Sequence, residues 1–281
     1  MVKRLIILAG FIACLAQGKT QSMQSFVHEG EFGVSLGLGH YFGDLNDNFA
    51  LNDPKFAAGI FYRKQFNNYV GLKIAGNYAF LGYSDAYSSN AVQKTRNLSF
   101  NSDVWELSLS GDFNFFKFYP GFSEYRYTPY VSLGIGVFSY DPYAYLGGTK
   151  YFLRPLGTEG QGSSLYPSLK PYSNIAVSIP FAVGFKYALN ENINVFGEIC
   201  YRFTTTDYLD DVSGTYAPDA FPTDANGNPT VGFLLQDRSY ETGTSIGVKG
   251  RQRGNGPQKD SYATIQFGIS FNLQSYRCPS H

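Results

Sequence analysis

The residue alternation between Ser261 and Leu273 constrains the fold of this chain more than any other feature of its sequence. Apolar side chains occupy every second position there, and small or polar ones lie between them: Ala263, Ile265, Phe267, Ile269, Phe271 and Leu273 against Thr264, Gln266, Gly268, Ser270 and Asn272. A helix cannot sort these residues onto two faces, whereas a β-strand does so through its two-residue period. A strand in a soluble sandwich usually has about 5–6 residues, so this run is long. Its apolar and water-compatible faces are typical of an outer-membrane β-barrel.

Seven further runs show the same alternation. They lie at about residues 31–41, 55–66, 69–81, 103–118, 127–140, 174–187 and 192–203. The connections between the eight runs alternate in length without exception. Those near residues 67–68, 119–126 and 188–191 are short, and those at 42–54, 82–102, 141–173 and 204–260 are long. Bacterial barrels have short periplasmic turns and longer extracellular loops, so the sequence predicts an all-β fold, an eight-stranded antiparallel up-and-down transmembrane β-barrel with both termini in the periplasm.

Composition agrees with this prediction. Charged residues make up 16% of the chain, below the roughly 25% of ordinary soluble domains. After the N-terminus no stretch reaches the roughly 18 apolar residues of a membrane-spanning helix. The formal net charge is zero, which gives no reason to expect nucleic acid as a partner. No cofactor and no small-molecule substrate are expected either.

The N-terminus reads as a secretory signal, because Lys3 and Arg4 precede a short apolar run. Cleavage is expected between Ala16 and Ser22, so that residues 1–22 form the signal peptide, 23–273 the barrel and 274–281 a periplasmic tail. The residues before Cys14 faintly resemble a lipoprotein box, and lipidation of Cys14 is the alternative to ordinary cleavage.

Eight strands leave a lumen just wide enough for side chains to fill. Strand parity places a set of charged side chains inside, namely Glu106, Asp112, Glu198, Arg202 and Arg63. We therefore expect a neutralised polar plug and not a conducting pore.

Outside the strands, two charged segments lie at opposite ends of the connection 204–260. The first contains Asp207, Asp210 and Asp211, and the second contains Arg251 and Arg253. Three carboxylates within five residues suit Ca²⁺, but the spacing lacks the ligand order of an EF-hand, so capping of the turn by the aspartates is favoured. The basic segment is expected either to touch lipopolysaccharide or to pair with the acidic one, as Arg253 with Asp211.

Two other side chains raise chemical alternatives. His40 is a candidate base for a lipid-modifying enzyme, but the sequence brings no serine to it, and a catalytic triad needs three groups within hydrogen-bond reach. Cys278 lies in the tail, in an oxidising compartment if the tail is periplasmic. A bridge from Cys278 to Cys200 would require the tail to enter a filled lumen. The alternatives left open for Cys278 are an intermolecular disulfide and an unpaired thiol.

Several segments resemble one known family. They are Glu31–Val34 with Tyr41–Leu45, the segment TDYLDDVSGTY at Thr206–Tyr216, Arg253–Asn255 with Asp260–Tyr262, and the ending Arg277–Pro279. Together they resemble PorG-type outer-membrane proteins of the type IX secretion system in Bacteroidota. The aspartate-rich segment also occurs in other barrels of that phylum. Gln252 and Gly256 depart from the pattern of the basic loop.

The resemblance implies an assembly role without catalysis. PorG-type proteins are small barrels that tie a periplasmic ring of the PorK lipoprotein and PorN to the outer membrane, and Cys278 would then be the candidate for a covalent tether to a ring lipoprotein. The alternative from a different class is a ligand-binding or adhesion barrel that acts through its extracellular loops.

Overall fold

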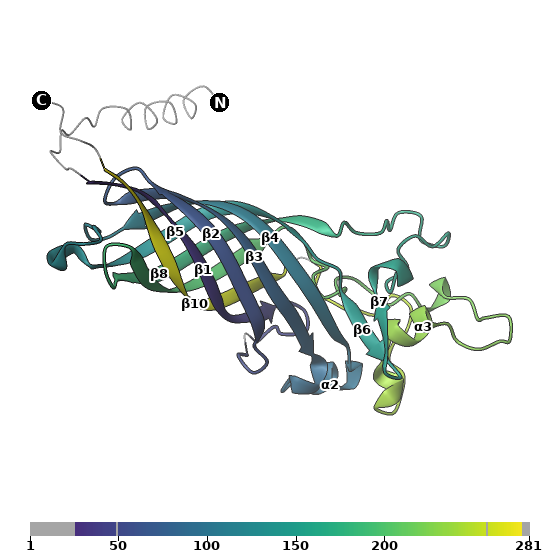
Figure 1. Ribbon diagram of the computed structural model, residues 1–281. Coiled ribbons are helices and arrows are strands. Elements are labelled where there is room, and N and C mark those ends of the chain that lie inside the picture. Colours follow the sequence, from purple (N-terminus) through teal and green to yellow (C-terminus); the bar gives the residue numbers. More distant parts are fainter. Residues whose placement is uncertain (1–25, 49, 257, 277–281) are drawn as a thin grey trace, which may run out of the picture. The chain divides into compact units, whose positions relative to one another are not determined.

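The computed structural model describes residues 26–48, 50–256 and 258–276 (Figure 1). Its compact unit is His28–Leu273, and the account below concerns this unit. The predicted signal peptide and most of the predicted tail, including Cys14 and Cys278, lie outside the described residues.

Eight long strands form one closed antiparallel barrel. They are β1 (Phe26–Phe42), β2 (Lys55–Gln65), β3 (Val70–Ser84), β4 (Ser99–Asn114), β5 (Tyr127–Ser139), β8 (Ile175–Ala188), β9 (Ile193–Thr204) and β10 (Ser261–Tyr276). Each strand pairs with the next along the chain, and β1 lies beside β10 to complete the ring. The predicted eight-stranded barrel is confirmed.

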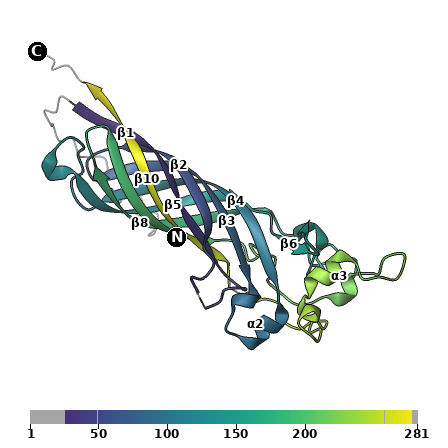
Figure 2. The same ribbon diagram turned by 60° about the horizontal axis from the view of Figure 1, so that its bottom comes forward.

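The alternation of short and long connections holds only in part. Residues 66–69, 115–126 and 189–192 connect strands at the end where β1 enters and β10 leaves, called the turn end here. The first and third of these have four residues each, but 115–126 has twelve, as many as the connection 43–54 at the opposite end. Residues 43–54, 85–98, 140–174 and 205–260 form long connections at the opposite end, called the loop end (Figures 1 and 2). These four connections together are called the loop cap.

The loop cap contains secondary structure that was predicted to be loop. A hairpin of β6 (Tyr143–Leu146) and β7 (Thr149–Phe152) lies in the third long connection. Its two turn residues, Gly147 and Gly148, have φ of 56° and 81°, and a Gly-Gly pair is suited to this two-residue hairpin turn. Short helices complete the cap: η1 (Asp85–Tyr87), α2 (Ala91–Arg96), η3 (Arg154–Leu156), η4 (Pro218–Ala220), α3 (Val231–Gln236) and η5 (Ser239–Glu241). Among the described residues, no helix is long and apolar enough to cross a membrane.

Two predicted strand boundaries were wrong. β4 lies at Ser99–Asn114 and not at 103–118, because the backbone beyond it turns, with the Phe116 N–H donating to the Thr128 hydroxyl at 3.0 Å. β1 begins at Phe26, before the predicted residue 31. β10 runs from Ser261 to Tyr276.

The outward face of the barrel is an exposed apolar surface. Alternate residues of β1 and β10 supply part of it, for example Leu36 at 63% and Phe267 at 69% exposure. Aromatic rings pack together near both margins, Tyr127 with Phe185 at 6.0 Å at the turn end and Tyr201 with Phe203 at 4.8 Å nearer the loop end. An apolar band between two aromatic girdles is the surface that outer-membrane barrels present to lipid.

Two glycines on opposite faces of the wall provide a test of this packing. A Cβ on Gly37 would overlap the backbone carbonyl of Ile265 and lie 2.7 Å from the Cα of Gln266, whereas a Cβ on Gly76 would meet only the Ile60 side chain at 3.7 Å. We expect Gly37→Ala to lower the free energy of unfolding by about 1–3 kcal/mol through overpacking. The matched variant Gly76→Ala should leave it unchanged or raise it by about 0.4–1 kcal/mol. Urea unfolding in detergent micelles measures the free energy of unfolding of both variants. Equal changes in the two would contradict the placement of the two glycines on opposite faces of the wall.

Candidate functional site

The lumen is filled by paired charged side chains. Arg63 on β2 lies between Glu31 and Asp112 and forms an ion pair with each. Lys73 pairs with Glu198 at 2.7 Å and Arg202 with Glu106 at 2.7 Å, while Lys186 lies 3.4 Å from Glu31. The inward charged residues are therefore four carboxylates and four cations: Glu31, Glu106, Asp112 and Glu198 with Arg63, Lys73, Lys186 and Arg202.

These pairs close the interior. A burial that leaves a charge unpaired is strongly unfavourable, and each lumen charge has a partner of opposite sign. The internal cavity beside Lys73 and Arg202 has a volume of about 30 Å³, which is room for about two water molecules. Among the described residues, the lumen beside Lys73 and Arg202 is therefore filled by paired side chains.

The structure places all five predicted interior residues, Glu106, Asp112, Glu198, Arg202 and Arg63, in this network. The prediction missed Glu31, Lys73 and Lys186, which complete it. Strand parity would have found them, because each alternates with outward apolar residues, as Lys73 does between Leu72 and Ile74.

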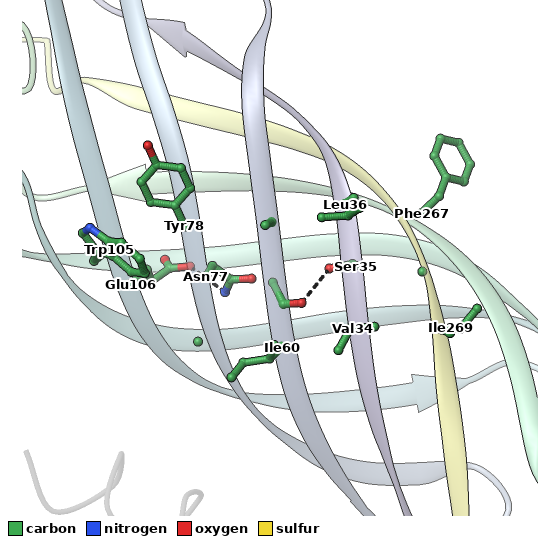
Figure 3. A pocket seen from close by; sticks show the side chains of 14 residues that line it. Val34, Ser35, Leu36, Ile60, Asn77, Tyr78, Trp105, Glu106, Phe267 and Ile269 are labelled. Carbon is green, nitrogen blue, oxygen red and sulfur yellow. Dashed lines mark hydrogen bonds between the residues drawn. The ribbon is translucent and has the colours of Figure 1, made fainter.

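The outer wall is hollowed over β10, β1, β2, β3 and β4, in a depression of about 700 Å³. Figure 3 shows side chains that border it, among them Leu36, Trp105 and Phe267. Two outward positions in the hollow, Ala58 and Gly76, carry only a methyl group or no side chain, which leaves room between the larger side chains. The depression belongs to the outward apolar face, and its lining suits acyl chains.

The loop cap is organised around two buried arginines, of which Arg96 at the end of α2 is the first. Its guanidinium donates to both carboxylate oxygens of Asp85 at 2.7 Å. It also donates to the backbone carbonyl of Asp44 at 3.0 Å and to that of Arg253 at 2.6 Å. Arg96 thus joins the first, second and fourth long connections.

The second arginine is Arg253. It donates to Glu159 at 3.1 Å and to the backbone carbonyl of Asp211, and its guanidinium lies 3.7 Å from the Asp211 carboxylate. Glu159 in turn accepts from the backbone N–H groups of Ser213 at 2.9 Å and Gly214 at 3.0 Å. Arg253 therefore joins the third long connection to the fourth, so that the two arginines link all four.

Buried carboxylates meet beneath these arginines. The Tyr41 hydroxyl, at the end of β1, lies 2.6 Å from a carboxylate oxygen of Asp210 and 3.0 Å from one of Asp260. Burial raises the pKa of both carboxyls well above the ordinary value. Repulsion from Asp260 and Asp44 raises the pKa of Asp210 further, and repulsion from Asp44 and Asp207 does so for Asp260. Burial also raises the pKa of Asp211 to about 6 and that of Asp44 to about 6.

The predicted acidic and basic segments meet in part. Asp210 and Asp211 lie in the buried cap, and Asp207 accepts from the Ser213 hydroxyl at 2.5 Å. Arg253 is buried against Asp211, whereas Arg251 is exposed. Within the described part of the chain, no group of three or more His, Cys, Asp or Glu side chains is arranged to hold a metal ion.

The remaining candidates lie apart from this cap network. His40 is buried, and its Nε2 is within hydrogen-bond distance of the Ala50 carbonyl and of the Asn46 amide at 3.2 Å. Cys200 is a buried free thiol on the inner face of β9. Sequence reasoning missed Arg96 and Glu159, because loop residues have no periodicity from which their facing can be inferred.

The chain is similar to several solved barrels. These include Neisserial surface protein A (10% identity, TM-score 0.43, 90% of this chain and 100% of that one). The attachment invasion locus protein Ail of Yersinia pestis shares 12% identity with a TM-score of 0.38, over 87% of this chain and 99% of that one. A major outer membrane protein of Thermus thermophilus shares 11% identity with a TM-score of 0.38, over 88% of this chain and 100% of that one.

At the level of sequence, no curated protein matches the chain. A family model does match it, over residues 7–154, which is more than half of its length, and that family is described as a domain of unknown function, DUF6089. The chain therefore belongs to the DUF6089 family.

Proposed function

We propose that this protein is a non-enzymatic outer-membrane component of a type IX protein secretion machinery. In this proposal the barrel resides in the outer membrane with both termini in the periplasm. It anchors a periplasmic ring that resembles the PorK lipoprotein and PorN. The turn end of the barrel and the tail beyond β10 face that ring.

The observation that carries the proposal is the meeting of the segments that resemble PorG-type proteins. Tyr41 contacts Asp210 and Arg253 contacts Asp211, although these segments lie far apart in the chain. The backbone N–H of Asn255 donates to Asp44 at 2.9 Å. The segments that carry the resemblance thus meet in one buried network of this chain, and this meeting is what supports the proposal.

The filled lumen supports an anchoring role over a transport role. Four inward cations pair with four inward carboxylates, and a passing solute would have to break these buried pairs. In this proposal the barrel holds the protein in the membrane, and the two ends of the barrel contact other proteins.

Cys278 is the proposed covalent contact, on the ground of the resemblance. We expect native protein, purified from detergent-solubilised membranes without reductant, to migrate on a gel as a heavier band that contains a periplasmic lipoprotein. Reductant and the substitution Cys278→Ser should both abolish this band. The matched variant Cys200→Ser should keep it, because Cys200 is buried in the barrel.

Mass spectrometry of the co-purified proteins gives the second readout. Recovery of ring proteins with wild-type protein supports the anchor, and Cys278→Ser should reduce their yield after a high-salt wash. Absence of any periplasmic protein from the wild-type preparation would contradict the proposed function.

A further inference from the structure

A polar cleft opens in the loop cap, away from the turn end to which the proposed anchor is assigned. Its volume is about 560 Å³, within the range of about 300–1,000 Å³ that is usual for small-ligand sites. The first, second and fourth long connections supply its walls, among them Asp47, Asn90 and Gln252. Arg96 and Arg253 hold these three connections together at its base.

The side chains that line the cleft have unused hydrogen-bonding capacity. Asp47, Gln252 and Gln258 are exposed there. Asn90 uses its carbonyl oxygen to accept from the Val92 N–H at 2.9 Å, which leaves its amide nitrogen to donate. Asn255 extends the row with another exposed amide, whose nitrogen donates to the side-chain oxygen of Gln258 at 3.5 Å and whose oxygen remains to accept.

A buried hydroxyl at the base of the cleft lacks a partner. Tyr216 lines the cleft with a side chain that is 1% exposed. Its hydroxyl has no hydrogen-bond partner among the residues that the structure describes. An unpaired buried polar group is costly, so a ligand that brings a hydroxyl to this position would gain by satisfying it.

The charges of the cleft disfavour other ligand classes. Nucleic acid requires a series of free cationic donors, but the guanidinium of Arg96 is spent on Asp85 and that of Arg253 on Glu159. Arg251 is the exposed cation at the cleft, and its guanidinium donates to the Ile246 carbonyl at 3.4 Å. A peptide that docks by its apolar side chains requires an apolar pocket, whereas the apolar lining here is limited to Val92, Ile246 and the Tyr216 ring. What remains is a row of amides that both donate and accept, the Asp47 carboxylate that accepts and the Arg251 guanidinium that donates, beside small apolar surfaces.

We infer that the cleft binds a saccharide. Neighbouring sugar hydroxyls both donate and accept, which matches the amide and carboxylate groups of Asp47, Gln252 and Gln258. The C–H faces of the sugar ring match Val92 and Ile246. The cell's own lipopolysaccharide carbohydrate and free oligosaccharides share this chemistry, and the experiment below separates them.

The test uses full-length protein folded in detergent. The probes are an oligosaccharide array and, on the same support, the delipidated carbohydrate of the source strain's lipopolysaccharide. Isothermal titration of the best array ligand should show that Asp47→Ala combined with Gln252→Ala weakens binding at least about tenfold, the equivalent of about 1.4 kcal/mol. Asp224→Ala, an exposed aspartate of the same connection outside the cleft, should leave the affinity unchanged.

Each outcome decides the inference. If the protein binds only the strain's own carbohydrate, the ligand of the cleft is the cell's own lipopolysaccharide. If it binds free oligosaccharides, the ligand is a glycan from outside the cell. The inference would be overturned if protein with a normal heat-dependent mobility shift bound no saccharide. It would also be overturned if the cleft variant and Asp224→Ala bound the ligand with equal affinity. Since Cys278 takes no part, the outcome is independent of the proposed anchor.

Discussion

Replacing Arg63 with methionine is expected to lower the free energy of unfolding of the barrel by about 3–5 kcal/mol, the usual cost of removing one partner from a buried ion pair. The Arg63 side chain is 1% exposed and pairs with both Glu31 and Asp112. Methionine fills a similar volume, so the loss comes from the two carboxylates that remain. Lys186 lies 3.4 Å from Glu31 and compensates it in part, whereas Asp112 loses its ion-pair partner.

Urea unfolding in detergent micelles, followed by the heat-dependent mobility shift on gels, measures this effect. The matched control is Arg126→Met, an exposed arginine at the turn end, which should change the free energy of unfolding by less than about 0.5 kcal/mol. A change below about 1 kcal/mol in Arg63→Met would contradict a closed, ion-paired lumen.

A second substitution distinguishes charge from packing. Adding Asp112→Asn to Arg63→Met removes the carboxylate that the first change leaves unpaired, and the double variant should recover a large part of the lost stability. Replacement of both partners of a buried pair by neutral residues is often nearly neutral. If the double variant instead lost the sum of the free energies of unfolding lost by the two single variants, the cost of Arg63→Met would have to come from packing.

The barrel could be predicted from the sequence because strand parity is a simple rule. A strand places alternate residues on opposite faces, so the outward positions of Leu107 and Ile265 and the inward position of Glu106 followed from counting. The same count gives Glu31, Lys73 and Lys186, which the prediction did not use. Within the strands, the side of the barrel wall to which each side chain points is therefore fixed by local chain geometry alone.

The loop cap could not be predicted in the same way. Arg96 and Glu159 are separated in the chain from Arg253 and lie in segments without periodicity, so nothing local indicates which groups they bind. Their partners include backbone groups, such as the carbonyl of Asp44 and the N–H of Ser213, which the sequence does not distinguish. The β6–β7 hairpin is the exception, because Gly147-Gly148 carries a local turn signal.

The loop cap is expected to loosen as the pH rises. Asp211 has a folded-state pKa of about 6 against an ordinary value of 3.8, and the pKa values of Asp210 and Asp260 are raised well above 3.8. A carboxyl with a raised pKa binds more protons in the folded cap than in the unfolded one. Its stabilising contribution is therefore complete below about pH 4 and is lost as the pH rises through the folded pKa.

The geometry around Tyr41 explains why a proton is held there. The hydroxyl has one proton, yet it lies within hydrogen-bond distance of both Asp210 and Asp260. One contact is satisfied by that proton, and the other requires a proton on a carboxyl group. Once both carboxyls ionise, one of the two carboxylates lies at about hydrogen-bond distance from the Tyr41 oxygen with no proton between them. The two buried negative charges also repel each other.

Hydrogen exchange of residues 206–216, corrected for intrinsic rates, measures this loosening. Between pH 5.5 and 8.5 the protection of this segment should fall at least about tenfold, the equivalent of one unit of pKa difference or about 1.4 kcal/mol. Asp210→Asn should reduce that pH dependence, because the amide keeps an acceptor for Tyr41 and cannot ionise. The control Asp224→Asn should show the wild-type fall, since Asp224 is exposed and its pKa lies below the range tested. Constant protection from pH 5.5 to 8.5, or a rise with pH, would show that Asp210 and Asp260 do not share a proton in the folded cap.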